Sequence, residues 1–228
     1  MDDFDDTDLF ISLGLEVKLM RFIGNVLVPS NLMFNIAVER GPEADDNDIE
    51  LALNKWRYWL DQIVSKSIVF CKDNTAAMDM LLDDAGVKRT GNLFVLVPEE
   101  PSDELLGTLI QAKFNALGKG DLMAVSMEVT SDNLHGLSFT ILGDHSQYLP
   151  QRAEDFIGGP TFWERPWWHR DDASSIDVLK PSEDAKPPAW AYSLDFLDRQ
   201  AQKKGPAITT RPGFKPTIID GGKPDKPK

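Results

Sequence analysis

Cysteine, histidine and long apolar runs are all scarce in this sequence of 228 residues, which has one cysteine and three histidines. The single cysteine, Cys71, cannot form a disulfide within the chain. Its place in the apolar run SIVFC favours a buried structural thiol over a nucleophile. No stretch approaches the roughly 18 consecutive apolar residues of a membrane helix. We therefore expect a protein without a membrane-spanning segment.

The first residues, MDDFDDTDLF, are acidic where a secretory signal is basic. Disulfides are typical of secreted proteins, and one cysteine cannot supply one within the chain. Both observations favour a cytoplasmic location.

The common signatures of nucleotide and zinc sites are also missing. The glycine pair in GKGD, at 118–121, lacks the spacing of a phosphate-binding loop, and no GxGxxG occurs. There is no CxxC, and no two histidines are four residues apart. No GxSxG marks a nucleophilic serine. The sequence therefore predicts no cofactor and no evident small-molecule substrate.

Acidic residues dominate the first two thirds of the chain but not the last third. Residues 1–150 contain 25 Asp and Glu against 11 Lys and Arg, whereas residues 151–228 contain 12 against 13. Residues 199–228 are basic, with eight Lys and Arg against two Asp. The acidic part would repel a phosphate backbone, so nucleic acid is a disfavoured partner and a basic protein surface suits it better.

Hydrophobic periodicity predicts an α/β (α+β) domain over residues 1–150. Alternating residues predict two strands, at 15–23 and 31–39, joined by a turn around residues 28–30. The later patterns predict helices over about 49–63, 75–85 and 102–117, and strands at 67–71, 92–97, 121–130 and 136–142. We expect a mixed sheet with hairpins at its start and end, and about three helices covering one or both faces.

Proline separates the remainder of the chain from this domain. Ten of the fifteen prolines follow residue 150, so we place the domain boundary within residues 143–150. Residues 151–228 are too rich in proline for a second sheet. They are expected to form an extended aromatic and basic arm with one short helix within residues 190–204.

The arm is nevertheless rich in aromatic residues, above all in the run PTFWERPWWHR at 160–170. A segment that cannot fold alone but carries large apolar side chains is expected to fold against another surface. One alternative is the sheet face or edge of its own domain. The other is a second protein, with arginines supplying ion pairs or cation–π contacts at the rim. The predicted partner-binding residues are Phe162, Trp163, Arg165, Trp167, Trp168, Arg170 and Trp190.

Two further alternatives stay open. Asp144-His145 and the run 169–172 place carboxylates beside imidazoles, as a hydrolase that depends on a divalent metal requires, although no ligand spacing selects them. Tryptophans and a basic arm also suit single-stranded nucleic acid, because bases stack on aromatic rings. The acidic domain argues against that interpretation.

The leading hypothesis is a non-enzymatic binding or assembly protein. Its arm would dock on a neighbouring subunit or partner in a multisubunit cellular or viral complex, and the partner could be a second copy. An acidic inhibitor or immunity-type protein that masks a basic target is a variant of the same hypothesis.

Overall fold

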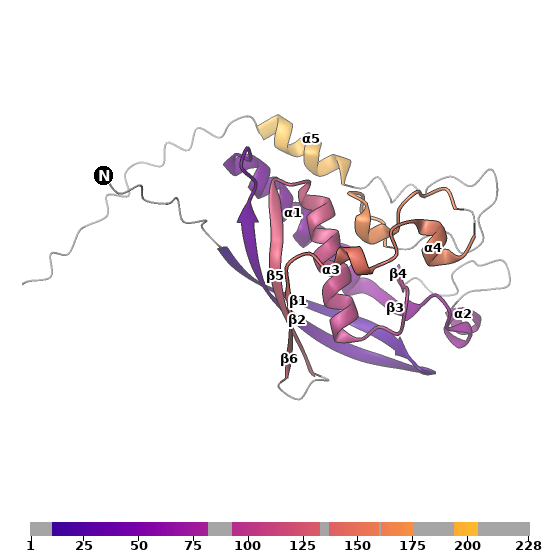
Figure 1. The fold of residues 1–228 in the computed structure, drawn as a ribbon. Coiled ribbons are helices and arrows are strands. Elements are labelled where there is room, and N and C mark those ends of the chain that lie inside the picture. Colours follow the sequence, from indigo (N-terminus) through magenta and orange to yellow (C-terminus); the bar gives the residue numbers. More distant parts are fainter. Residues whose placement is uncertain (1–10, 82–92, 133–136, 160, 176–193, 205–228) are drawn as a thin grey trace, which may run out of the picture.

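The computed structural model of the protein describes residues 11–81, 93–132, 137–159, 161–175 and 194–204. A single mixed sheet carries helices on one side (Figure 1). The elements follow in the order β1 Ile11–Ile23, β2 Val26–Arg40, α1 Asp46–Gln62, η1 Val64–Lys66, β3 Ser67–Cys71, α2 Thr75–Leu81, β4 Leu93–Val97, α3 Asp103–Gly118, β5 Leu122–Ser131, β6 Ser138–Leu142, η3 Ser146–Tyr148, α4 Ala153–Ile157, η4 Trp167–His169 and α5 Asp195–Lys204.

The six strands lie in the order β4-β3-β1-β2-β5-β6. β1–β2, β2–β5 and β5–β6 are antiparallel pairs, whereas β1–β3 and β3–β4 are parallel. The predicted mixed sheet is therefore confirmed, and the first two and the last two strands of the chain form antiparallel pairs within it. β4 and β6 are the two edge strands.

The turn of the first hairpin is not where the sequence predicted it. The strands are joined at Gly24 and Asn25, and Gly24 has φ 58°, a conformation that favours glycine. The predicted turn at residues 28–30 is wrong, because these residues lie inside β2. β5 pairs with β2 only from Leu32 onward. Pro29 therefore lies in a part of β2 that has a single neighbouring strand, where a missing N–H is tolerated.

Side-chain caps place the starts of both long helices where the sequence predicted them. The carboxylate of Asp45 accepts hydrogen bonds from the backbone N–H groups of Asn47 (2.8 Å) and Asp48 (2.9 Å) at the start of α1. The hydroxyl of Ser102 accepts one from Leu105 N (3.1 Å) at the start of α3. The acidic cluster before α1 thus acts as a helix cap.

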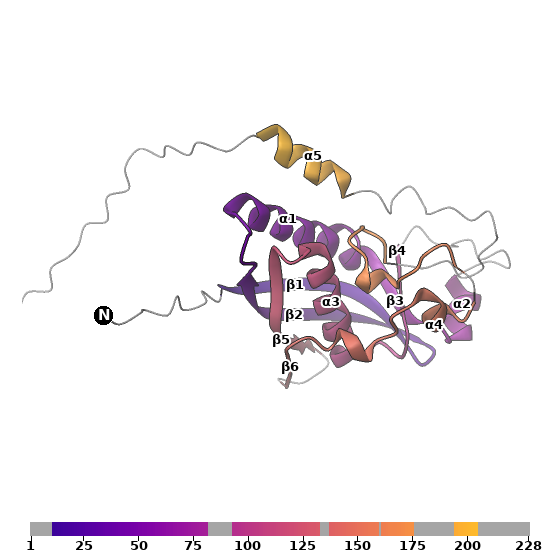
Figure 2. The ribbon, with the colours of Figure 1, turned by 45° about the horizontal axis from the view of Figure 1, so that its top comes forward.

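α1 and α3 cover the same face of the sheet (Figure 2). Alternate residues of β2 point toward them and are almost fully buried, and the residues between are more exposed, including Met33 at 52%. α3 approaches β5 and β6 closely at Gly107, where an added Cβ would lie 2.6 Å from Val129 and 2.7 Å from Ile141. One face of the sheet therefore builds the main core.

The hydrophobic core continues past residue 150. Phe156, Trp167, Trp168, Ala173 and Leu194 belong to the same cluster of buried side chains as the sheet and the two long helices. The division of the chain into two units near residues 143–150 stays a prediction, but at least part of the region beyond it is packed on the domain.

α5 confirms the short helix predicted within residues 190–204 and lies along α1 (Figure 2). Lys55 Nζ of α1 lies 2.8 Å from a carboxylate oxygen of Asp198. The rings of Tyr58 and Phe196 meet edge to face with their centroids 5.1 Å apart. In the described part of the chain, no helix is long and apolar enough to cross a membrane.

Candidate binding surface on the strap

Residues 161–175, called the strap below, form an irregular segment that lies beside α3 and the edge strand β4 (Figure 1). Its only regular element is the short helix η4. Two of its tryptophans, Trp167 and Trp168, are completely buried. The strap is therefore anchored in the core of its own chain.

The strap makes hydrogen bonds along the outer edge of β4. The indole Nε1 of Trp167 donates to Leu96 O over 2.7 Å. Leu96 N donates to Ser175 O (3.3 Å), and the hydroxyl of Ser175 donates to Phe94 O (3.2 Å). Backbone groups that an edge strand would leave open to another strand are thus engaged within the chain.

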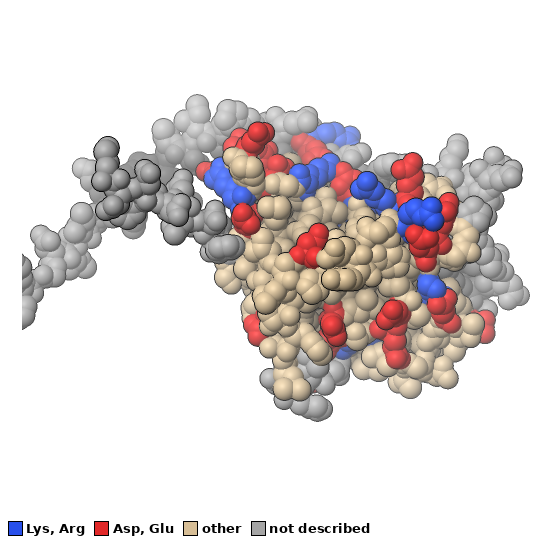
Figure 3. All heavy atoms as spheres, in the orientation of Figure 1, with Lys and Arg blue, Asp and Glu red and all other residues tan. Residues whose placement is uncertain are grey.

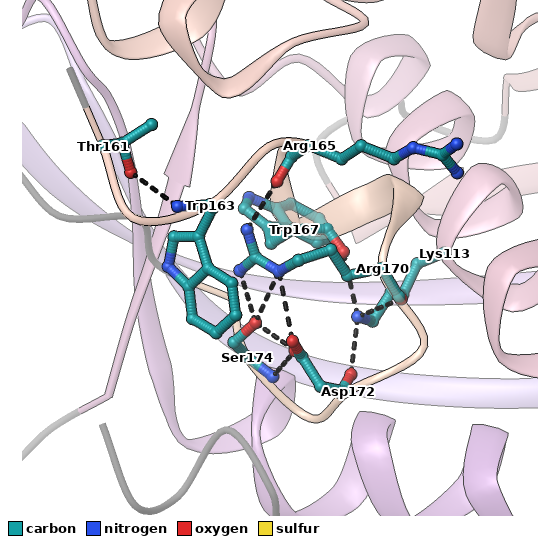
Figure 4. A network of polar contacts seen from close by, with 8 residues as sticks. All are labelled: Lys113, Thr161, Trp163, Arg165, Trp167, Arg170, Asp172 and Ser174. Atoms are coloured by element: carbon teal, nitrogen blue, oxygen red, sulfur yellow. Dashed lines mark hydrogen bonds and ion pairs between the residues drawn. The ribbon is translucent and has the colours of Figure 1, made fainter. Parts of the chain in front are cut away.

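Lys113 of α3 is hydrogen-bonded to the backbone of the strap (Figure 4). Its side chain is fully buried, and its Nζ donates to three strap carbonyl oxygens, those of Trp167 (2.9 Å), Arg170 (2.7 Å) and Asp172 (2.6 Å). An ammonium group has three N–H donors, so these carbonyls match its capacity. The Nζ also lies 5.9 Å from the centroid of the Trp59 ring. The buried charge fixes the backbone of the strap at three points.

An aromatic cluster joins the strap to the two long helices. Trp167 packs on Trp59 of α1 with ring centroids 5.6 Å apart, and it meets Trp168 edge to face at 5.3 Å. Trp168 in turn meets Phe156 of α4 at 4.8 Å. Rings of this size dominate the apolar area that a core buries. The strap is consequently part of the folded domain.

A second polar network, centred on Arg170, joins side chains within the strap (Figure 4). The guanidinium carbon of Arg170 lies 3.8 Å from the centroid of the Trp163 ring. Arg170 also donates to the backbone O of Arg165 (2.7 Å) and to Asp172 Oδ2 (3.2 Å), and it bonds the hydroxyl of Ser174. One face of the Trp163 ring is therefore covered by a cation of the same segment.

An open groove lies between the strap and the end of α3. Its lining includes Phe162, Trp163, Arg165 and His169 from the strap and Lys119 from the end of α3. The ring centroids of Phe162 and Trp163 are 4.7 Å apart, and both side chains are half-buried. Glu164, Asp171 and Asp172 also line it, so the groove combines aromatic surface with groups of both charges.

His169, at the border of the groove, has a lowered pKa. Burial lowers the pKa of His169 below its ordinary value, and the charge of Arg165 lowers it further. The carboxylate of Asp144 and a hydrogen bond with the backbone of Pro150 act in the opposite direction but are outweighed. The imidazole contributes a neutral polar group to the groove.

The structure places the predicted partner-binding residues in different settings. Trp167 and Trp168 pack on their own domain, which is the first of the two alternatives drawn from the sequence. Arg170 makes its cation–π contact within the strap, with Trp163. Arg165 is exposed, and its side chain points away from the network (Figure 4). Phe162 borders the groove, and Trp190 lies outside the described residues.

The carboxylates of the predicted metal site have other partners. Asp171 lies 2.5 Å from Lys119 Nζ. Burial alone would raise the pKa of Asp171, but its hydrogen bond with Lys119 and the charge of that lysine hold it below the ordinary value. Asp172 pairs with Arg170, and Asp144 accepts a hydrogen bond from Ser146 N. Among the described residues, no three His, Cys, Asp or Glu side chains gather as metal ligands would.

Lys113 is the residue that sequence reasoning missed. It lies four residues after Leu109 and four before Leu117, on the apolar stripe that predicted α3. A lysine at such a position is buried with its charge, and a buried ammonium needs acceptors from elsewhere in the chain. A lysine within an otherwise apolar stripe was therefore the sequence signal that could have revealed this buried charge.

No known family model matches the sequence, and no curated protein is significantly similar to it.

Proposed function

We propose that this chain is a non-enzymatic binding protein that engages a protein partner through the exposed side of the strap. One observation carries the proposal. Phe162 and Trp163 lie against each other, and within the described part of the chain neither is among the side chains of the hydrophobic core or those packed against it. Covering β4 requires Trp167 and Ser175, but it does not require these two rings. Aromatic side chains outside the core, at the border of a groove, are typical of interface anchors.

The support beneath this surface favours binding. Lys113 fixes the backbone of the strap through three hydrogen bonds, and Arg170 covers one face of the Trp163 ring. A surface that is already ordered loses little conformational entropy when a partner arrives. Binding to this aromatic border would therefore cost little conformational entropy.

The chemistry of the groove suggests what the partner presents. An apolar side chain would fill the space beside Phe162 and Trp163, and a carboxylate would pair with the exposed guanidinium of Arg165. Such a segment belongs to a protein, either a subunit of the same assembly or a target that this protein inhibits. The acidic character of residues 1–150 favours basic surface around that segment.

The test compares partner capture by variants that keep the fold. The purified wild-type chain is used to capture proteins from cells that express it, and each captured protein is then purified and titrated calorimetrically. We expect Trp163→Ala and Arg165→Glu each to weaken binding by about 30-fold, the size of an interface anchor. Trp163→Phe keeps an aromatic face beneath Arg170 and serves as the matched control, with a loss of less than about fivefold.

Circular dichroism and thermal unfolding must show that the variants remain folded. Equal affinity of the wild type, Trp163→Ala and Arg165→Glu for every captured protein would refute the proposal.

A further inference from the structure

The second edge of the sheet is built differently from the first. Among the described residues, β6 (Ser138–Leu142) pairs with β5 alone, so its outer side faces no other described strand. Three apolar side chains at or beside it are exposed, Leu137 at 69%, Phe139 at 39% and Leu142 at 68%. β6 therefore combines an open row of backbone groups with uncovered apolar surface.

β6 is short, at five residues, but it lacks two other devices that keep an edge strand from pairing. Its sequence, SFTIL, contains no charged residue and no proline. The surface around β5 and β6 carries few charged side chains in the view of Figure 3. A strand of this composition accepts a further strand readily.

We propose that β6 pairs with β6 of a second copy of this chain, in antiparallel orientation, to form one sheet across two molecules. This surface is separate from the groove at Trp163, so the inference goes beyond the function proposed above. A two-fold axis would pass between the two β6 strands, and most homodimers have two-fold symmetry.

The strand is complementary to itself in one register. All five residues pair only when Thr140 lies opposite Thr140 of the second copy, which places Phe139 opposite Ile141 and Ser138 opposite Leu142. Pairs of threonines and pairs of aromatic with β-branched residues are favourable across antiparallel strands. Phe139 and Ile141 share the face that packs toward Val129 and Met127, so the second copy would cover the exposed part of the Phe139 ring.

Charge and size limit the affinity of this pairing. Two copies that each carry a formal net charge of −13 repel each other, and an uncharged strand is the place where they can meet with the least repulsion. A pairing five residues long buries less than the roughly 800 Å² per partner of a stable interface. We therefore expect reversible association that strengthens as protein concentration and salt increase.

Sedimentation velocity over a range of protein concentrations tests the proposal. The wild-type chain should change from monomer to dimer as its concentration rises. Thr140→Lys should weaken dimerisation at least about tenfold, because the two introduced lysines would face each other at the axis. The substituted residue points to the open face opposite Glu128 of β5, so the fold should persist. Ser12→Lys adds the same charge to the same face at the distant strand β1 and should leave dimerisation unchanged.

Charge exchange then tests the register. Thr140→Glu alone should also be monomeric, whereas an equimolar mixture of Thr140→Lys and Thr140→Glu should dimerise, because only the mixed pair places opposite charges at the axis. The proposal is overturned if the wild type is monomeric at every concentration. It is equally overturned if Thr140→Lys dimerises as the wild type does, or if the mixture stays monomeric.

Discussion

The two edge strands of the sheet, β4 and β6, differ in whether other residues of the chain cover them. At β4 the strap supplies an indole N–H, a backbone carbonyl and a hydroxyl to the edge strand and buries two tryptophans beside it. At β6 the described residues add nothing beyond β5, and apolar side chains are exposed. Neither SFTIL nor LFVLV contains a charged residue or a proline, so the protection of β4 comes from residues elsewhere in the chain and not from its own composition.

The largest expected effect on stability comes from removing the charge of Lys113, which holds the strap that covers β4. Lys113→Met keeps most of the apolar stem of the side chain but leaves three strap carbonyls, one buried and two partly buried, without this donor. We expect the free energy of unfolding to fall by about 3–5 kcal/mol. Urea denaturation measures this loss. Hydrogen exchange at the amide of Leu96, which donates to the strap, should accelerate in the same variant.

Lys119→Met is the matched control for that variant. Lys119 lies at the end of the same helix, but its side chain is 52% exposed and its partner is Asp171. Its removal should cost less than about 1 kcal/mol. A similar loss in the two variants would contradict the role assigned to Lys113.

A smaller effect should separate the hydrogen bond at β4 from the burial of the rings. Trp167→Phe and Trp168→Phe remove the same atoms from two fully buried tryptophans. Trp167 Nε1 donates to Leu96 O, whereas Trp168 Nε1 has no hydrogen-bond partner in the described part of the chain. We expect Trp167→Phe to destabilise by about 1 kcal/mol more than Trp168→Phe, measured by urea denaturation. Equal losses would mean that the indole N–H contributes nothing to covering the edge.

The smallest expected effect lies at the open edge. A hydrogen bond from Ser138 of β6 is the main cause that lowers the pKa of Glu128 on β5, and one from Asn35 adds to it. Because the pKa is lower in the folded state, this contribution is present above the ordinary pKa of glutamate and is lost as the pH falls through the folded value. Ser138→Ala should therefore raise the pKa of Glu128, followed by NMR titration of its carboxyl carbon. Asn35→Ala should raise it less, and an unchanged pKa in Ser138→Ala would contradict the assignment.

Local signals in the sequence predicted most of the fold. Asp45 and Ser102 marked the starts of the two long helices, and alternation along 31–39 predicted which residues of β2 face the core. The exception is instructive. Pro29 was interpreted as part of a turn because proline rarely lies within a sheet, but that part of β2 has only β1 beside it. The neighbours of a strand decide whether proline is tolerated, and a local pattern does not contain them.

The candidate site was less predictable, for a related reason. The run at 160–170 drew attention through its tryptophans, and its composition predicted that they pack on something. Which rings turn inward depends on contacts far along the chain, such as that of Trp167 with Leu96 and with Lys113. Strand order is decided by long-range pairing in the same way. Alternation alone gives no means of placing β5 beside β2 and leaving β6 at the edge.

The position of the strap in the chain has a consequence for biosynthesis. A ribosome completes β4 at Val97 long before it reaches the strap at residues 161–175. During that interval the nascent chain can assemble β1 to β4, but the indole of Trp167 that caps Leu96 does not yet exist. The outer edge of β4 is therefore open to mispairing in the interval between the synthesis of β4 and that of the strap.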